Sequence, residues 1–139
     1  MIKLSVHMMT YNCEKYIDKS LKSVLSQQTT FPFEIIISDD ASTDKTYQIS
    51  TDIAENYEFI KLHKNKDNLG ILKNFFETLR RCKGKYVFDL AGDDWLSNPY
   101  ALQTLVDELD QNPNYSFVDS GFDCYYERSG IIKSFINQN

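Results

Sequence analysis

The sequence predicts an α/β protein built on a mostly parallel sheet, and three observations indicate this class. Segments rich in β-branched residues alternate with segments whose apolar residues recur at helical spacing. The strand-like segments are continuously apolar, which is typical of strands covered by helices on both faces. The strand–helix alternation repeats along the chain, as in right-handed parallel crossovers. We therefore expect a three-layer α/β/α sandwich that closes with a hairpin.

The first half of the chain predicts three strands and two helices. The run FEIIIS is a β-branched core strand, and IKLSVHM is apolar enough to be its neighbour. Ile17, Leu21 and Val24 follow helical spacing and predict an inward helix face. The elements expected here are strands at 2–8, 33–38 and 58–64 and helices at 14–27 and 44–57.

The second half continues the alternation and then changes character. Leu72, Phe75, Phe76 and Leu79 recur at helical spacing, so we expect them to face inward. The last segment turns at a Ser-Gly pair and reads as a hairpin. The elements expected here are helices at 71–82 and 100–111, strands at 85–91 and 115–120, and a hairpin over 122–136.

Composition narrows the function classes. A chain of 139 residues with 42% hydrophobic residues fits one globular domain. The net charge of −5 disfavours a nucleic-acid partner. No apolar run reaches the roughly 20 residues of a membrane span, and no leader sequence is evident. Three widely spaced cysteines predict reduced thiols. We expect a cytoplasmic protein, with association at the inner face of the membrane open for a full-length form.

Polar residues follow each of the first four expected strands. Since ligands of open α/β sheets bind at the carboxyl ends of the strands, these loops predict a ligand site. The four groups are Thr10-Tyr11-Asn12, Ser38-Asp39-Asp40, Asn65 to Gly70 with Asn68 between them, and Gly92-Asp93-Asp94.

Local structural roles compete with this interpretation. Asn12 could cap the following helix, and Asp40 could form a turn, although Ser42 or Thr43 can cap the next helix. Asn68 and Gly70 could form only a turn.

Asp93 and Asp94 lack such a local role, because Ser97 or Asn98 can cap the helix that Pro99 begins. Paired carboxylates predict a hard cation, Mg²⁺ or Mn²⁺. Neither GxGxxG nor GxxxxGK[ST] is present, so the metal would hold a diphosphate. Tyr11 offers a flat face to a base, and Asp40 could accept the imide N–H of uracil. These residues predict a site for a nucleoside diphosphate.

Four segments resemble the family 2 glycosyltransferases, which have the GT-A fold: TYNCEKYIDKSLKSVLSQ, FEIIISDDASTDKT, NKDNLGILKNF and GKYVFDLAGDDWL. Together they cover about residues 2 to 120 in the family's order. The resemblance implies metal-assisted transfer of a sugar, with inversion, from a nucleotide diphosphate, most often a uridine one. Its implied site residues are Thr10, Tyr11 and Asn12 around the nucleotide, Asp40 at the base, Asn68, Gly70 and Lys73 near the ribose and diphosphate, and Asp93 with Asp94 at the metal.

Two departures from the family pattern affect the expected activity. Ala91 stands where the family's Asp-x-Asp motif has its first acid. The family's general base lies well beyond the metal motif, and only proximity makes Asp119 and Asp123 candidates for it. We therefore expect the donor-binding part of a longer enzyme.

Several functions and partners stay open. The leading one is transfer from a UDP-sugar to a saccharide or glycolipid acceptor. The alternatives are a non-catalytic nucleotide-sugar-binding module and a nucleotidyl transferase, although the latter usually has a Gly-rich phosphate loop. The apolar hairpin at 122–136 could also pair with a second copy of the chain as an edge.

Overall fold

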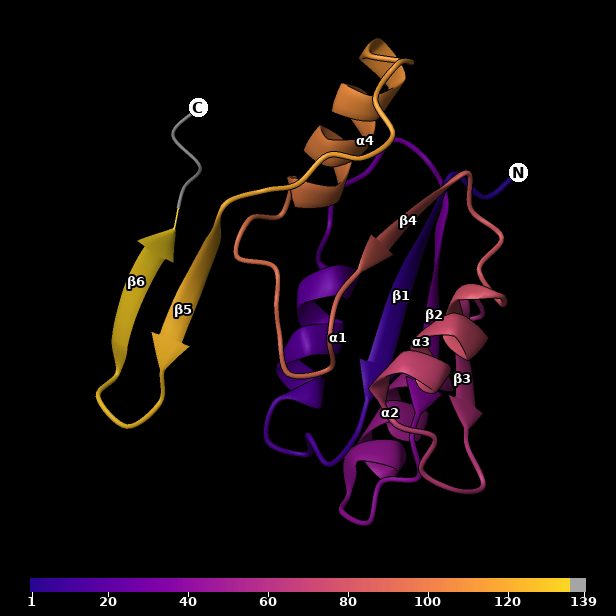
Figure 1. The fold of residues 1–139 in the computed structure, drawn as a ribbon, viewed down its shortest axis with the longest axis vertical. Helices are drawn as coiled ribbons and strands as arrows, with labels where there is room; N and C mark the ends of the chain where they lie inside the picture. Colours follow the sequence, from indigo (N-terminus) through magenta and orange to yellow (C-terminus); the bar gives the residue numbers. More distant parts are fainter. Residues whose placement is uncertain (136–139) are drawn as a thin grey trace. The chain divides into compact units, whose positions relative to one another are not determined.

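The computed structural model describes residues 1–135, which fall into two units that divide between Gln103 and Thr104. The first unit contains a four-stranded parallel sheet in the order β3-β2-β1-β4 (Figure 1). This confirms the predicted α/β class and most of the predicted order of strands and helices along the chain. Its elements are β1 Leu4–Thr10, α1 Ile17–Leu25, β2 Phe33–Asp39, α2 Thr46–Ala54, β3 Ile60–Lys64, α3 Ile71–Leu79 and β4 Tyr86–Asp89.

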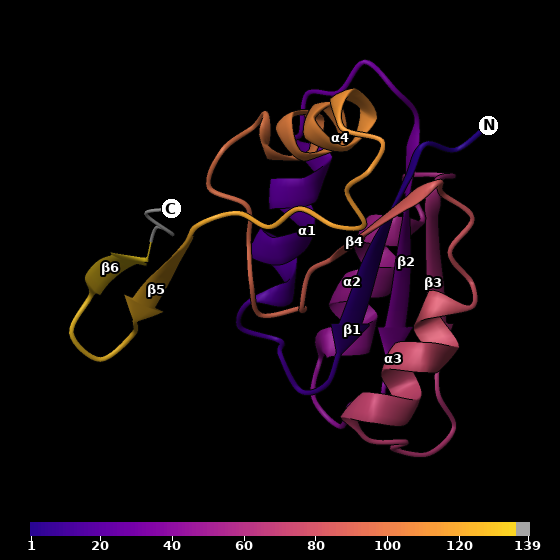
Figure 2. The same cartoon turned by 45° about the horizontal axis from the view of Figure 1, so that its top comes forward.

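The core of the first unit lies on the two central strands and α1. Six of the seven residues of β1 and six of the seven of β2 are buried, as expected for strands that helices cover on both faces. Ile17, Leu21 and Val24 of α1 are fully buried, so the predicted inward face of this helix is confirmed. Figure 2 shows α1 and α2 on one face of the sheet and α3 on the other. All four strands end at the same edge, where the polar loops lie.

The face that α3 turns to the sheet differs from the prediction. Leu72 and Phe76 are 71% and 50% exposed, so their expected inward orientation is wrong. Asn74 and Thr78 are the buried residues of this helix instead. The hydroxyl of Ser38 on β2 donates to the side-chain oxygen of Asn74 at 2.8 Å. Because a buried hydroxyl needs a partner, this bond favours the polar stripe of α3 over its apolar one.

The helix α4 spans Ala101–Gln111, and the second unit begins within it at Thr104. The second unit also contains an antiparallel hairpin of β5 Phe122–Tyr126 and β6 Ile131–Phe135. Gly130 has a φ of 66° in the turn, which confirms the predicted Ser-Gly turn. The strand predicted at 115–120 is absent from the described residues, and Phe117 is 78% exposed. A strand requires a hydrogen-bonding neighbour, and none pairs with this segment within residues 1–135. Residue 136 of the predicted hairpin lies outside the described residues.

Candidate functional site

The loop after β1 is fastened to the loop after β2. The Thr10 hydroxyl donates to the Asp39 carboxylate at 3.2 Å. Asn12 has a φ of 48°, and its side-chain oxygen accepts the Thr43 backbone N–H at 2.8 Å. Asn12 therefore joins the two loops and does not cap α1, which begins at Ile17. Tyr11 is 52% exposed between these two anchored residues.

Asp40 connects the loop after β2 to the loop before α3. One carboxylate oxygen accepts the Asn65 side-chain N–H and the Leu69 backbone N–H, each at 2.8 Å. The other oxygen accepts the Gly70 backbone N–H at 2.9 Å. Asp40 is only 4% exposed. Its first role is therefore to shape the loop over residues 65–70, a role that the sequence did not reveal.

The predicted turn at Asn68 and Gly70 is present and lies against Asp40. The Asn68 side chain donates to the Asp40 carbonyl at 3.2 Å and accepts the Gly70 N–H at 3.0 Å. Gly70 has a φ of 77°, which a residue with a side chain adopts only with strain. These bonds bring Asn68 and Gly70 to the same sheet edge as Asp40.

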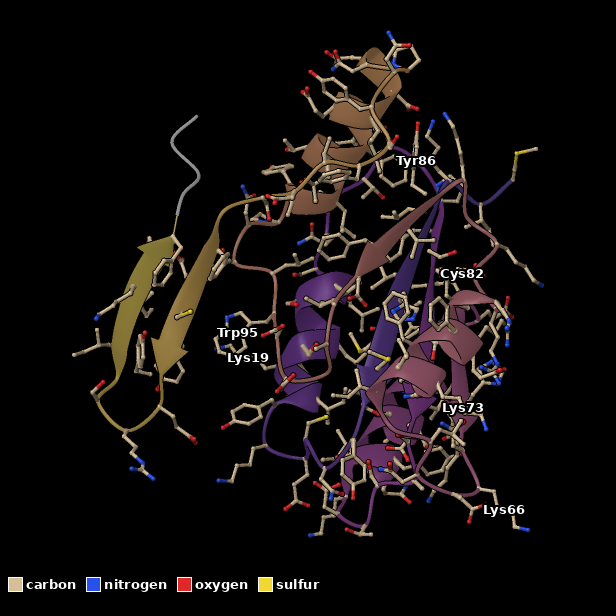
Figure 3. The ribbon with its side chains drawn as sticks, viewed as in Figure 1. Lys19, Lys66, Lys73, Cys82, Tyr86 and Trp95 are labelled. Atoms are coloured by element: carbon tan, nitrogen blue, oxygen red, sulfur yellow. The ribbon has the colours of Figure 1, made fainter. Side chains whose placement is uncertain are left out.

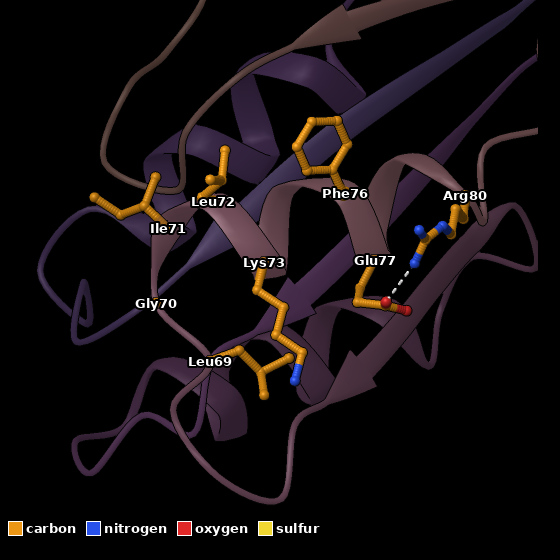
Figure 4. Close-up of a pocket in the computed structure, with 8 residues that line it drawn as sticks. All are labelled: Leu69, Gly70, Ile71, Leu72, Lys73, Phe76, Glu77 and Arg80. Carbon is orange, nitrogen blue, oxygen red and sulfur yellow. Dashed lines mark hydrogen bonds and ion pairs between the residues drawn. The ribbon is translucent and has the colours of Figure 1, made fainter.

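Lys73 lies one turn into α3, beside an open pocket on the outer side of that helix. Figure 4 shows its side chain reaching back toward Leu69, whereas Ile71, Leu72 and Phe76 extend from another side of the helix. Figure 3 places Lys66 and Lys73 in the same lower region of the first unit. The pocket is lined by Leu69, Gly70, Ile71, Leu72, Lys73, Phe76, Glu77 and Arg80.

Gly92 attaches the loop after β4 to the end of β1. Its N–H donates to the Met9 carbonyl at 2.9 Å. A Cβ at this position would lie 2.7 Å from Cγ2 of Thr10 and 2.9 Å from the Cys13 sulfur. Only glycine fits this approach without displacing its neighbours. Asp93 and Asp94 follow directly, so the packing of Gly92 fixes where the acid pair begins.

The carboxylates of Asp93 and Asp94 form no hydrogen bond or ion pair with residues 1–135, and both side chains are exposed. Burial, followed by the charges of Asp93 and Asp89, raises the pKa of Asp94. Asn98 supplies the cap before α4, since its side chain accepts the Tyr100 N–H at 2.9 Å. The acid pair consequently has no local structural role, as its sequence context predicted.

Asp93 and Asp94 could supply two carboxylate ligands to a magnesium-type ion, and the remaining ligands would have to come from outside the protein. Among the described residues no group of three His, Cys, Asp or Glu side chains could hold a metal. Mg²⁺ is commonly held by one or two carboxylates, with the phosphate oxygens of a ligand and water completing its shell. Asp93 and Asp94 match that pattern.

The roles of Asp44 and Asn74, and the hydrogen bonds of Asn65, were not foreseen from sequence. Asp44, rather than Ser42 or Thr43, accepts the first backbone N–H of α2, from Thr46, at 2.9 Å. Asn65 and Asn74 form a polar chain that ends at Asp40, with 2.9 Å between the Asn65 nitrogen and the Asn74 oxygen. Asp44 precedes Thr46 by two residues, a spacing that resembles a cap signal. Asn65 was expected at this edge only as a polar residue after a strand, and Asn74 carries no comparable signal.

Trp95 follows the acid pair and forms a cation–π contact with Lys19. The Lys19 ammonium of α1 lies 3.3 Å from the centroid of the Trp95 ring, and the two residues lie together in Figure 3. A cation over an indole face is a favourable contact. It attaches the acid loop to α1, in addition to its attachment to β1 through Gly92.

Taken together, the parallel sheet, its four linked carboxyl-edge loops and the exposed acid pair define an α/β protein with a candidate ligand site at that edge. Residues 5–136 match Glycosyl transferase family 2. The chain belongs to this family, which confirms the resemblance seen in the sequence.

Two curated bacterial relatives place this chain among proteins much longer than itself. It is 38% identical over 120 residues to the putative glycosyltransferase EpsE of Bacillus subtilis, covering 86% of this chain and 42% of EpsE. It is 35% identical over 102 residues to the poly(ribitol-phosphate) beta-N-acetylglucosaminyltransferase TarS of Staphylococcus aureus, covering 70% of this chain and 17% of TarS. The chain thus spans less than half of each relative.

Solved structures confirm the GT-A fold. S. aureus TarS in complex with UDP-GlcNAc superposes with a TM-score of 0.72 at 33% identity, over 81% of this chain and 32% of that one. The mannosyltransferase PcManGT of Pyrobaculum calidifontis gives a TM-score of 0.70 at 24% identity, over 77% and 32% of the two chains. At that identity, the second structure supports the fold alone. No helix within residues 1–135 is long and apolar enough to cross a membrane.

Proposed function

We propose that this chain binds a nucleoside diphosphate sugar, preferably a UDP-sugar, together with Mg²⁺ or Mn²⁺. In this proposal it is the donor-binding part of a glycosyltransferase that acts with inversion on a hydroxyl of a saccharide or glycolipid. Family membership supports the reaction class. The TarS structure with UDP-GlcNAc supports a uridine donor, because it shares the fold at 33% identity.

The observation that carries the proposal is the exposed and unpartnered acid pair Asp93-Asp94. Two adjacent carboxylates repel each other, and the raised pKa of Asp94 reflects that repulsion in part. The packing of Gly92 nevertheless holds the pair at the ligand edge of the sheet. A bound cation and a diphosphate would relieve the repulsion.

Each remaining residue has a proposed role. Tyr11 stacks on the base, since its ring is exposed at the end of β1. Asp40 holds the loop over residues 65–70 and offers its remaining acceptor capacity to the imide N–H of uracil. Thr10 and Asn12 fix the loop that carries Tyr11, while Asn68, Gly70 and Lys73 border the ribose and diphosphate. A divalent cation at Asp93 and Asp94 would stabilise the charge of the departing diphosphate.

Metal-linked binding of UDP tests this function. Calorimetry with UDP, GDP and CDP, each with Mn²⁺ and with EDTA, should show binding that is strongest for UDP and requires the metal. Asp93→Asn should abolish the metal-dependent part. Glu55→Gln removes the same charge from the exposed end of α2 and should leave binding unchanged. Equal binding of UDP in EDTA would overturn the proposed role of the acid pair.

A second candidate function is a binding module without turnover, and Ala91 is the observation that favours it. Ala91 replaces the first acid of the family motif, and its carbonyl accepts the backbone N–H of Asp94 at 3.0 Å. Asp119 and Asp123 belong to the second unit, and we assign no general base. Release of UDP from UDP-GlcNAc in the presence of acceptor by a full-length protein would favour the enzyme. Metal-dependent binding without any release would favour the module.

A further inference from the structure

His7 lies at the centre of β1 and is fully buried. Its Nδ1 lies 2.6 Å from a carboxylate oxygen of Asp89 on β4, and its Nε2 lies 3.1 Å from the Phe75 carbonyl on α3. The ring also packs on the Phe75 ring, with 4.7 Å between centroids. The His7 side chain thus joins β1 to β4 and also to α3, which no hydrogen bond of the sheet connects to these strands.

Both nitrogens of His7 face oxygens that can only accept hydrogen bonds. A carbonyl and a carboxylate carry no proton to donate. A neutral imidazole has a single N–H, so one of the two contacts would set a lone pair against a lone pair. Only the imidazolium donates to both partners, and the geometry therefore assigns a positive charge to His7.

The groups that face His7 agree with this charge. Burial alone lowers its pKa, but the Asp89 hydrogen bond, the Phe75 carbonyl and the Asp89 charge together raise the pKa above the ordinary 6.5. Asp89 is the charged group that acts on the ring from β4, and α3 contributes the uncharged carbonyl and ring of Phe75. On β2, His7 stands opposite Ile36, which carries no charge.

The position of β4 connects His7 to the acid loop. Within the described residues β4 is an edge strand of the four-stranded sheet and pairs only with β1. The His7 carbonyl accepts the Leu90 N–H at 3.0 Å, and the Met9 carbonyl then accepts that of Gly92. The side chain and backbone of His7 thus hold Asp89 and Leu90, which Ala91 and Gly92 separate from the acid pair.

We infer that His7 is a positioning residue for the loop of Asp93 and Asp94, and that it performs this role as an imidazolium. A histidine whose pKa is raised by folding stabilises the folded state fully below the unfolded pKa of about 6.5, and this contribution disappears as pH rises through the folded pKa. β4 should therefore loosen at alkaline pH. The consequence for donor binding rests on the function proposed above.

The charge itself can be measured without any ligand. Long-range ¹H–¹⁵N spectra should show both His7 nitrogens protonated at neutral pH and a titration above that of an ordinary histidine. His63 is the internal reference, because burial and the charge of Arg81 lower its pKa. A His7 ring with one unprotonated nitrogen at pH 6 would overturn the inference.

The positioning role is tested by the pH profile of UDP binding with Mg²⁺. The affinity for UDP should fall at least about threefold as pH rises through the His7 pKa. By linkage, a threefold loss corresponds to a change in the His7 pKa of about half a unit between the free and the UDP-bound protein. Asp89→Asn removes the charge that holds the proton and should move the fall to lower pH. Asp89→Glu should retain the parental midpoint, and His63→Gln should change nothing. Comparison at matched pH cancels the ionisation of UDP itself.

The possible outcomes separate the two proposals. A uniform loss of affinity in Asp89→Asn, with an unchanged pH profile, would reduce His7 to a structural role and overturn the inference. A parent chain that binds no UDP at any pH would overturn the proposed function instead. In that case the inference is decided by the nitrogen spectra and by whether thermal stability falls through the His7 pKa.

Discussion

The chain contains two Asp-Asp pairs near the carboxyl edge of the sheet, and the structure treats them in opposite ways. Asp39 and Asp40 are buried, and their carboxylates accept hydrogen bonds from the side chains of Thr10 and Asn65 and from the backbone amides of Ser42, Leu69 and Gly70. Asp93 and Asp94 are exposed, and their carboxylates have no hydrogen-bond or ion-pair partner within residues 1–135. The same dipeptide thus organises loops in one place and is left open in the other.

The difference shows how this sheet edge is divided between structure and ligand. Buried carboxylates must be hydrogen-bonded to be tolerated, so the first pair fixes the loops that surround the site. An exposed pair retains its hydration and can exchange water for a cation. The four predictions below break or sharpen this comparison, from the largest expected change in stability to the smallest.

Removing the Asp40 carboxylate should destabilise the fold most. Asp40→Ala removes the acceptor of the Leu69 backbone N–H and of one Asn65 side-chain N–H, and it leaves the Gly70 N–H only its bond to Asn68, at an expected cost of about 2–3 kcal/mol. Urea unfolding followed by circular dichroism measures this loss. Asp67→Ala is the matched control, because Asp67 is exposed in the same loop and should change stability by less than about 0.5 kcal/mol. Equal losses in both variants would refute the organising role of Asp40.

Asp40→Asn separates the two roles that we assign to this residue. The amide keeps one acceptor oxygen and should recover part of the stability. If Asp40 also accepts the uracil imide, the same variant should weaken UDP binding by about 1–3 kcal/mol relative to the parent. Unchanged affinity for UDP in a folded Asp40→Asn chain would leave only the structural role.

Gly92→Ala should have an intermediate effect, because it disturbs the support of the exposed pair. The added methyl would meet Cγ2 of Thr10 at 2.7 Å and the Cys13 sulfur at 2.9 Å. Overpacking of this kind costs about 1–3 kcal/mol. Thr10→Ser and Cys13→Ala each remove one of these atoms and should restore part of the stability when combined with Gly92→Ala. A stable single variant would show that the loop moves freely.

Much of the fold could be predicted from sequence, because β-branched runs and helical spacing report burial directly. β2 and α1 are clear examples. The prediction was wrong for α3 because periodicity does not report hydrogen-bonding partners. The buried hydroxyl of Ser38 favours Asn74 on the inner face, and this preference outweighs the exposure of Leu72 and Phe76. The strand expected at 115–120 is absent for a related reason, since composition does not reveal whether a neighbouring strand is available.

The candidate site was predictable in location but not in division of roles. The polar residues after each strand indicated the correct edge of the sheet. Whether a carboxylate such as Asp40 is open or occupied depends on backbone amides of residues 65–70, which are far from it in sequence. The pair of His7 and Asp89 lies 82 positions apart. An apolar strand containing one histidine predicts burial, but it does not identify the partner.

Asp93→Asn should have the smallest effect on stability and therefore tests the comparison most sharply. No side-chain hydrogen bond within residues 1–135 is lost, and the repulsion from Asp93, which together with the larger effect of burial raises the pKa of Asp94, is relieved. Above the range in which both acids ionise, we expect stability to change by less than about 0.5 kcal/mol, in the direction of stabilisation. Urea unfolding at pH 7 in EDTA measures this change without interference from a metal. The same variant should lose the stabilisation that the parent gains from UDP with Mn²⁺, since binding to the native state alone adds to its stability. A loss of stability in EDTA as large as that of Asp40→Ala would show that both pairs are structural, and the contrast between them would no longer hold.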